Sequence, residues 1–194
     1  MTQPEWLQPP TGRAAALSQA MASLVPVLRT ARLALRAPCL ADYPAYHEVF
    51  LSDRARYMGG PFTEEEAFAD FCQAVAGWML RGTGAWTITF HDADTALGWI
   101  YLWQEQGDPE PEIGWVLTEA AEGRGYATEA AKAVMPMALD LFGAGGFVSY
   151  IDASNAASAR IAAALGARRD LAAEAAYNEP DLQIWRHFGR KAGQ

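Results

Sequence analysis

The sequence predicts an α+β fold in which a mixed, mostly antiparallel sheet is layered between helices. Three β-like runs follow one another at residues 85–90, 96–103 and 112–117, separated by short polar turns, as in an antiparallel meander. Segments with a helical spacing of apolar residues precede and follow this meander. Because strands and helices do not alternate strictly, flanking helices on a largely antiparallel sheet are favoured over a doubly wound parallel sheet.

The chain divides near residue 27 into a short arm and one domain, which we place at residues 28–190. The arm begins with an irregular, proline-rich leader, and apolar spacing over residues 14–25 predicts one short helix in it. A length of 194 residues fits one domain with such an arm. The arm also offers contacts for a homodimer.

The first half of the domain carries one strand signal and two helix starts. Alternating leucine and arginine over residues 28–36 predict a single strand. Asp42 is placed to cap a helix that ends near Phe50. Thr63 and Glu66 have the spacing of a capping box, which predicts the start of a second helix. These helices lead into the meander.

A glycine-bearing turn at residues 122–127 separates the meander from the second half of the chain. Helical spacing begins near Thr128, and Pro136 is expected to kink this helix or end it early. Glycines allow a ligand to approach the backbone closely, and the N–H groups of a first helical turn lack partners. The turn is therefore a candidate site for a phosphate or pyrophosphate group.

The last part of the chain adds strands and one helix. Residues 147–151 predict a strand, after which Ser154 or Asn155 is placed to cap a helix. Two further strand candidates lie at residues 167–171 and 181–187, and the residues between them are expected to form a linker.

Composition excludes several classes of function. The net charge is −8 and the sequence pI is about 4.8, without a run of basic residues, so binding to nucleic acid is not expected. No apolar run is long enough to span a membrane, and we expect a cytoplasmic protein. Cys39 and Cys72 lack metal-ligand spacing, so they are expected to be buried thiols and no metal is predicted.

Two other phosphate-binding motifs do not fit the glycine turn. The chain has no Walker A string. A dinucleotide fingerprint would require a third glycine where Thr128 stands, and it would follow the first strand instead of a meander. A nucleotide-dependent oxidoreductase stays open as the least favoured alternative.

Three ordered segments resemble the GNAT superfamily of N-acetyltransferases, in its RimJ/RimL-like branch. They are TARLALRAPCLADYPAY from Thr30, EIGWVLTEAAEGRGYATEA from Glu112 and IDASNAASARIAAALGARR from Ile151, with DLQIWRH as the closing strand. The resemblance covers residues 28–188. It implies the GNAT fold with a splayed central strand pair, and transfer of an acetyl group from acetyl-CoA to a primary amine.

The resemblance also implies which residues bind the cofactor. The amides of the turn would hold its pyrophosphate, the edge of the strand at residues 115–117 its pantetheine arm, and the start of the next helix its sulfur end. The residues implied are Trp115, Val116, Leu117, Gly123, Arg124, Gly125, Tyr126, Ala127, Thr128, Asn155 and Ser158. Glu122 departs from the family, which carries Gln or Arg at this position.

Glu112 is the candidate general base, because the RimL-like branch carries a glutamate at this strand start. Ser158 is the candidate acid for the departing thiolate, and the N–H of Val116 or Leu117 is the candidate oxyanion donor. Each has a structural alternative: a solvated strand-end carboxylate for Glu112 and a backbone-bonded hydroxyl for Ser158. The tyrosines held in reserve as acids are Tyr126, Tyr150 and Tyr177.

The acceptor is left open between a protein N-terminal α-amine and a small-molecule amine, with the acidic balance favouring a cationic one. A non-catalytic acyl-CoA-binding module is the alternative function.

Overall fold

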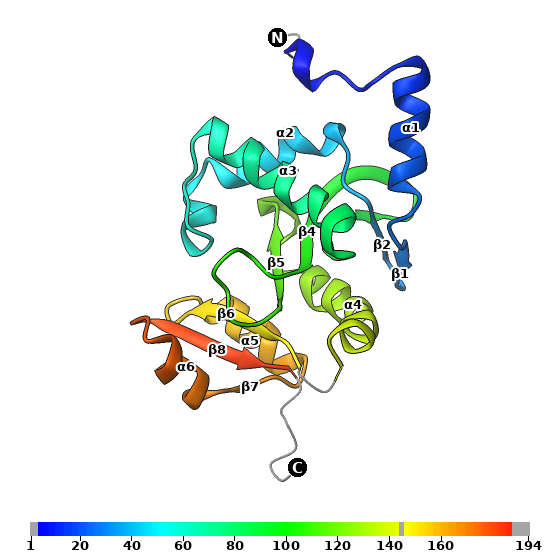
Figure 1. The fold of residues 1–194 in the computed structure, drawn as a ribbon. Coiled ribbons are helices and arrows are strands. Elements are labelled where there is room, and N and C mark those ends of the chain that lie inside the picture. Colours follow the sequence, from blue (N-terminus) through cyan, green and yellow to red (C-terminus); the bar gives the residue numbers. More distant parts are fainter. Residues whose placement is uncertain (1–3, 144–145, 188–194) are drawn as a thin grey trace.

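The computed structural model describes residues 4–143 and 146–187. The described residues form one eight-stranded mixed sheet with the order β1-β2-β3-β4-β5-β6-β8-β7 (Figure 1). The strands are β1 (Leu28–Arg29), β2 (Leu33–Arg36), β3 (Gly84–Phe90), β4 (Ala93–Trp103), β5 (Glu112–Leu117), β6 (Val148–Asp152), β7 (Arg168–Arg169) and β8 (Leu182–Arg186). Neighbours pair antiparallel except β5 and β6, which are parallel. The predicted α+β fold and its meander are confirmed.

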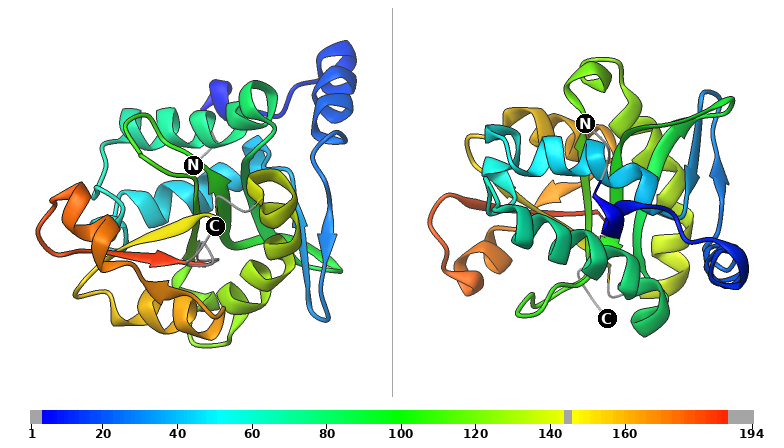
Figure 2. Two further views of the ribbon diagram at one scale, coloured as in Figure 1. Left: turned by 60° about the horizontal axis from the view of Figure 1, so that its bottom comes forward. Right: turned by 90° about the horizontal axis from the view of Figure 1, so that it is seen from above.

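Helices cover both faces of this sheet. Figure 2 shows α2 and α3 on one side of the strands and α4 and α5 on the other. The α-helices are α1 (Gly12–Ala22), α2 (Tyr43–Phe50), α3 (Glu64–Arg81), α4 (Tyr126–Phe142), α5 (Ala156–Ala164) and α6 (Leu171–Tyr177). Short 3-10 helices are η1 (Glu5–Leu7), η2 (Leu40–Asp42), η3 (Asp53–Tyr57) and η4 (Glu119–Ala121).

Two apolar cores hold these layers together, one on each face of β4. Trp99 is fully buried and packs with Tyr46 and Phe71 under α2 and α3. Ile100, the next residue, faces the opposite way and packs with Val134 under α4. Each large side chain buried in this way contributes roughly 1.5–3 kcal/mol relative to exposure. Packing on both faces of β4 therefore holds the sheet in place next to β5, the strand that pairs with β4.

The central strand pair is splayed. Within the described residues, β5 and β6 are paired at one position, Glu112 opposite Val148. Beyond it the strands diverge, so the residues toward Leu117 and Asp152 face each other across an opening. The predicted splayed pair is confirmed, and the opening holds the candidate functional site.

Two predictions on the first half of the domain were wrong. Residues 28–36 form a two-strand hairpin instead of one strand, because the Thr30 amide donates to the Leu33 carbonyl at 2.9 Å and closes a turn. Asp42 does not cap α2 with its side chain. Its buried carboxylate instead accepts hydrogen bonds from the Arg36 guanidinium and the Thr87 hydroxyl. The capping box of Thr63 and Glu66 is confirmed at the start of α3.

Two predictions on the second half were also wrong. The helix expected to start near Thr128 begins at Tyr126, and it does not end early at Pro136 but continues to Phe142. The side chains packed against the sheet on both sides of the proline outweigh its one missing N–H donor. The expected linker contains α6, which Asp170 caps by accepting from the Ala173 amide at 3.0 Å. Asn155 is confirmed as the cap of α5.

The cysteines and the arm complete the fold. Cys39 and Cys72 are free and exposed, not buried as expected. No residue of α1 is buried, and Figure 1 shows α1 projecting from the body of the molecule. The arm is attached further upstream, where Trp6 packs edge-on against Phe68 at a centroid distance of 4.8 Å. The predicted domain end at residue 190 lies outside the described residues. None of the described helices is long and apolar enough to cross a membrane.

Candidate active site

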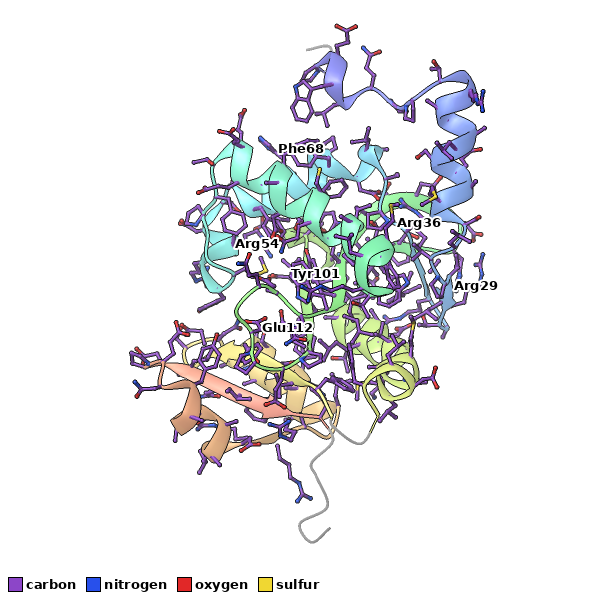
Figure 3. The ribbon with its side chains drawn as sticks, in the orientation of Figure 1. Arg29, Arg36, Arg54, Phe68, Tyr101 and Glu112 are labelled. Atoms are coloured by element: carbon purple, nitrogen blue, oxygen red, sulfur yellow. The ribbon has the colours of Figure 1, made fainter. Side chains whose placement is uncertain are left out.

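A cleft of about 930 Å³ opens where β5 and β6 separate. Figure 3 shows Glu112, Tyr101 and Arg54 beside it, between the α2–α3 layer and the β6–β8 half of the sheet. It brings together eight of the residues predicted from the sequence: Glu112, Trp115, Val116, Leu117, Gly123, Ala127, Asn155 and Ser158. These residues come from β5, the glycine turn and the start of α5, so the predicted grouping holds in space.

Four predicted residues do not line the cleft: Arg124, Gly125, Tyr126 and Thr128. The Tyr126 ring is buried against Phe90, with the Arg32 guanidinium 4.6 Å above the ring centroid. Its hydroxyl is thus removed from the cleft wall, whereas the other two reserve acids, Tyr150 and Tyr177, lie on that wall.

The glycine turn presents backbone donors at the mouth of the cleft. Gly123 and Gly125 have φ angles of +72° and +78°, a left-handed conformation that favours glycine. Gly125 is the N-cap of α4 and brings no side-chain acceptor to the first turn. The N-terminal amides and the positive end of a 17-residue helix therefore stay available to an anion.

Ser158, at the start of α5, connects this helix to β5 across the opening, and Asn155 caps the helix beside it. The Asn155 side-chain oxygen accepts from the Ser158 amide at 3.1 Å, which leaves the Asn155 NH₂ group available. The Trp115 indole on β5 donates to the Ser158 hydroxyl oxygen at 3.3 Å. Because that oxygen is the acceptor, the hydroxyl proton of Ser158 remains available for donation.

Glu112 lies where β5 and β6 still touch, and its surroundings favour the protonated carboxyl group. Burial, and then the nearby carboxylates of Glu105 and Asp108, raise its pKa to about 7. The Trp103 indole donates to the Glu112 carboxylate at 2.7 Å and opposes this rise by stabilising the charged form. Glu112 can therefore exchange a proton near neutral pH.

Sequence reasoning missed several carboxylates of the cleft, among them Asp70, Glu105 and Asp108. Burial, with smaller contributions from Asp70 and Asp108, raises the pKa of Glu105 to about 7. Within the described part of the chain none of the three forms an ion pair. They come from α3 and from the β4–β5 connection, so no local motif unites them. This side of the cleft is therefore lined by acidic groups, of which Glu105 and Glu112 are only partly ionised near pH 7.

No cluster of residues able to hold a metal ion occurs within residues 4–143 and 146–187. The cleft offers two carboxyl groups with pKa values of about 7, a serine hydroxyl, tyrosine hydroxyls, and strand and helix amides.

Known acetyltransferases share both the sequence and the architecture. YnaD, an uncharacterised N-acetyltransferase of Bacillus subtilis, is 29% identical over 146 residues, covering 74% of this chain and 83% of its own. The crystal structure of an acetyltransferase from Agrobacterium tumefaciens is 35% identical, with a TM-score of 0.79 and coverage of 85% of this chain and 95% of that chain.

The fold also matches that of RimL, a ribosomal alpha-N-protein acetyltransferase solved in complex with coenzyme A. The TM-score is 0.62 at 18% identity, over 85% of this chain and 99% of that chain. A family model described as an acetyltransferase (GNAT) domain matches residues 32–168, which is most of the chain. The chain therefore belongs to the GNAT family and is an acetyl-transferring enzyme.

Proposed function

We propose that this enzyme transfers the acetyl group of acetyl-CoA directly to a primary amine that enters from the acidic side of the cleft. The observation that carries the proposal is the continuity of one cleft from the α4 N-terminus, along the open edge of β5, to Glu112. A thioester bound along the edge of β5 would have its reactive carbonyl near Glu112, the first residue of that strand.

The cofactor side of the cleft fits the chemistry of coenzyme A. The amides of residues 123–128 would hold the pyrophosphate at the helix N-terminus. The Trp115–Leu117 edge would bind the amide-bearing pantetheine arm as it would bind another strand. The Asn155 NH₂ group, free of the capping bond, would bind the same arm near its sulfur end.

The reaction then needs one base, one oxyanion donor and one acid. Glu112 would remove a proton from the ammonium form of the acceptor, so that the nitrogen lone pair can form a bond to the thioester carbon. The N–H of Val116 or Leu117 would hold the carbonyl oxygen as it gains negative charge. Ser158 would give its proton to the sulfur as the carbon–sulfur bond breaks and would regain one from the nitrogen of the adduct, directly or through water, which releases the amide and a free thiol.

The charge of the acceptor side favours a cationic acceptor. Asp70, Glu105 and Asp108 line the same cleft as Glu112 without arginine or lysine partners among the described residues. Such a cleft attracts a positive amine and opposes an acidic one. A protein N-terminal α-amine is the easier nucleophile, because its pKa of roughly 8 is below the value of roughly 10.4 for a lysine side chain.

Calorimetric titration with acetyl-CoA, followed by a free-thiol assay over a panel of amines, tests the proposal. The panel should contain peptides with varied first residues, small diamines, and acidic peptides as the matched control. We expect binding, and thiol release that is faster with basic than with acidic acceptors. Absence of binding at millimolar acetyl-CoA would contradict the proposal. Binding without transfer to any amine would instead indicate an acyl-CoA-binding module.

A further inference from the structure

The 3-10 helix η3 contacts the segments that follow β5 and β6, on the two sides of the opening between these strands. On the β5 side, the Arg54 guanidinium forms an ion pair with the Glu122 carboxylate. On the β6 side, the Ser154 hydroxyl donates to the Tyr57 hydroxyl at 3.4 Å. Arg54, Tyr57 and Glu122 all line the same cleft. The helix η3 is thus held beside the glycine turn by side chains far apart in the sequence.

Glu122 begins the glycine turn with a negative charge. The next residue, Gly123, lines the cleft at the place proposed for the pyrophosphate. A carboxylate at this position would repel a diphosphate. The chain therefore needs a compensating positive charge close to Glu122 if the turn is to hold a dianion.

Of the arginines that line the cleft (Arg54, Arg56 and Arg160), Arg54 is the one paired with Glu122 in the described structure. Its side chain is 25% exposed, and one terminal nitrogen is taken by Glu122. Its Nε atom is buried and has no hydrogen-bond partner in the described structure. A planar guanidinium can bind a carboxylate with one edge and a phosphate oxygen with another. Arg56, on the same short helix, instead stacks over the Tyr57 ring at 4.5 Å.

We propose that Arg54 binds the pyrophosphate of the co-substrate across the cleft and offsets the negative charge at the first position of the glycine turn, while Glu122 positions its guanidinium. This rests on the proposed use of acetyl-CoA. Arg54 is a binding residue in this scheme and takes no part in proton transfer. The pyrophosphate would be bound from two sides of the cleft, by the N-terminal amides of α4 and by Arg54 of η3.

The test compares Kd values for coenzyme A and for pantetheine, which lacks the phosphates, in wild type, Arg54→Met, Arg56→Met and Glu122→Gln. Arg54→Met should weaken coenzyme A binding about 10-fold or more, as expected for loss of a charge-assisted hydrogen bond. Pantetheine binding should not change. Arg56→Met removes the same charge from the same helix and should have little effect on either ligand.

Glu122→Gln separates the positioning of Arg54 by Glu122 from the repulsion of the pyrophosphate by the negative charge of Glu122. Glutamine keeps an oxygen that can accept from Arg54 but removes the negative charge, so coenzyme A should bind more tightly than to wild type. Adding Glu122→Gln to Arg54→Met should recover part of the lost affinity. Arg54→Lys, which keeps the charge, should retain more affinity than Arg54→Met, and thermal melting checks that each variant folds. If Arg54→Met does not fold, the coenzyme A affinities of Arg54→Lys and Glu122→Gln test the proposal instead.

Equal coenzyme A affinities for the Arg54 and Arg56 variants would overturn the inference, as would an equal loss for pantetheine. Weaker coenzyme A binding by Glu122→Gln would overturn it as well. These results leave the proposed function intact as long as wild type binds acetyl-CoA and acetylates an amine. If wild type does neither, the proposed function itself fails.

Discussion

At the scale of single residues, the proton balance of Glu112 decides how the site would operate. Its carboxyl group is pulled toward the protonated form by burial and by two neighbouring carboxylates, and toward the charged form by the Trp103 indole. The resulting pKa of about 7 is suited to a general base that must accept a proton and then release it near neutral pH.

Glu112→Gln should lower kcat by about 10²–10⁴-fold, the usual contribution of a general base, with little change in acetyl-CoA affinity. In wild type, kcat/KM should rise with pH and level off above about 7, where Glu112 becomes the free base. The variant should lose this rise. Glu119→Gln, an exposed carboxylate on η4, serves as the control and should keep both rate and profile. Unchanged turnover in Glu112→Gln would remove Glu112 from the mechanism.

Trp103→Phe tests the hydrogen bond to Glu112. The indole N–H stabilises the charged carboxylate, so its loss should raise the pKa of Glu112 further. The ascending limb of kcat/KM should move to higher pH, while the plateau rate changes less. A limb that stays in place, or moves to lower pH, would show that this bond does not control the base.

At the scale of elements, the β4–β5 pair has a position where no side chain fits. Gly98 pairs with Leu117 and has a φ of +153°. A Cβ built on it would lie 2.2 Å from the Val116 carbonyl oxygen and 2.7 Å from the Leu117 Cα, both backbone atoms. Any larger residue must therefore displace β5, whose other edge is the proposed binding site of the pantetheine arm.

Gly98→Ala should destabilise the fold by about 3 kcal/mol, because backbone displacement adds to overpacking. Urea unfolding measures this loss. Gly107→Ala is the matched control: its φ is +104°, but a Cβ there meets no atom within 4 Å. It should show only the smaller cost of a left-handed backbone, about 1–2 kcal/mol. Equal losses of unfolding free energy in the two variants would indicate that β5 can move to accommodate a Cβ at little cost.

The elements that the sequence predicted correctly are those whose signals are local. The meander, the Thr63 capping box and the Asn155 cap each depend on residues within a few positions of one another. The helix α6 was missed because it is short and docks through a distant contact, in which Glu174 accepts from the Ile184 amide at 3.0 Å. At Pro136 the local signal predicted an early helix end, but tertiary packing of α4 outweighed the effect of the proline.

At the scale of the whole molecule, the part of the cleft proposed to bind the cofactor could be predicted from the sequence, and the part proposed to bind the acceptor could not. Residues 112–128 are contiguous, so one motif contains the strand edge, the turn and the helix start. The acidic wall joins Asp70 of α3 to Glu105 and Asp108 of the β4–β5 connection. Those residues meet only because α3 packs over the sheet, and nothing in their spacing indicates it. Arg54 and Glu122 likewise pair across 68 positions.

Molecular stability should depend on pH through His187, where β8 ends. This side chain is 4% exposed, and burial lowers its pKa to about 4, compared with about 6.5 when unfolded. The unfolded chain therefore takes up a proton first as pH falls, so stability is lost between pH 6.5 and 4, by on the order of 3 kcal/mol. The raised pKa values of Glu105 and Glu112 act in the opposite direction, lowering stability as pH rises toward 7.

Melting temperatures between pH 4 and 7 in wild type and His187→Asn isolate this effect. The variant should be less stable at pH 7 but should lose less stability on acidification, because the proton-binding group is gone. His91→Gln, at an exposed position, should follow wild type. Parallel curves for wild type and His187→Asn would show that His187 does not contribute to acid unfolding.

The single point of pairing between β5 and β6 has a consequence for the protein outside its reaction. Two strand edges face each other inside the sheet, and unpaired edges are templates for adding a strand from another chain. In most sheets such edges lie at the periphery, where bulges and charges protect them. Here the protection would come from the occupant of the cleft, so resistance to aggregation should follow the supply of co-substrate in the cell.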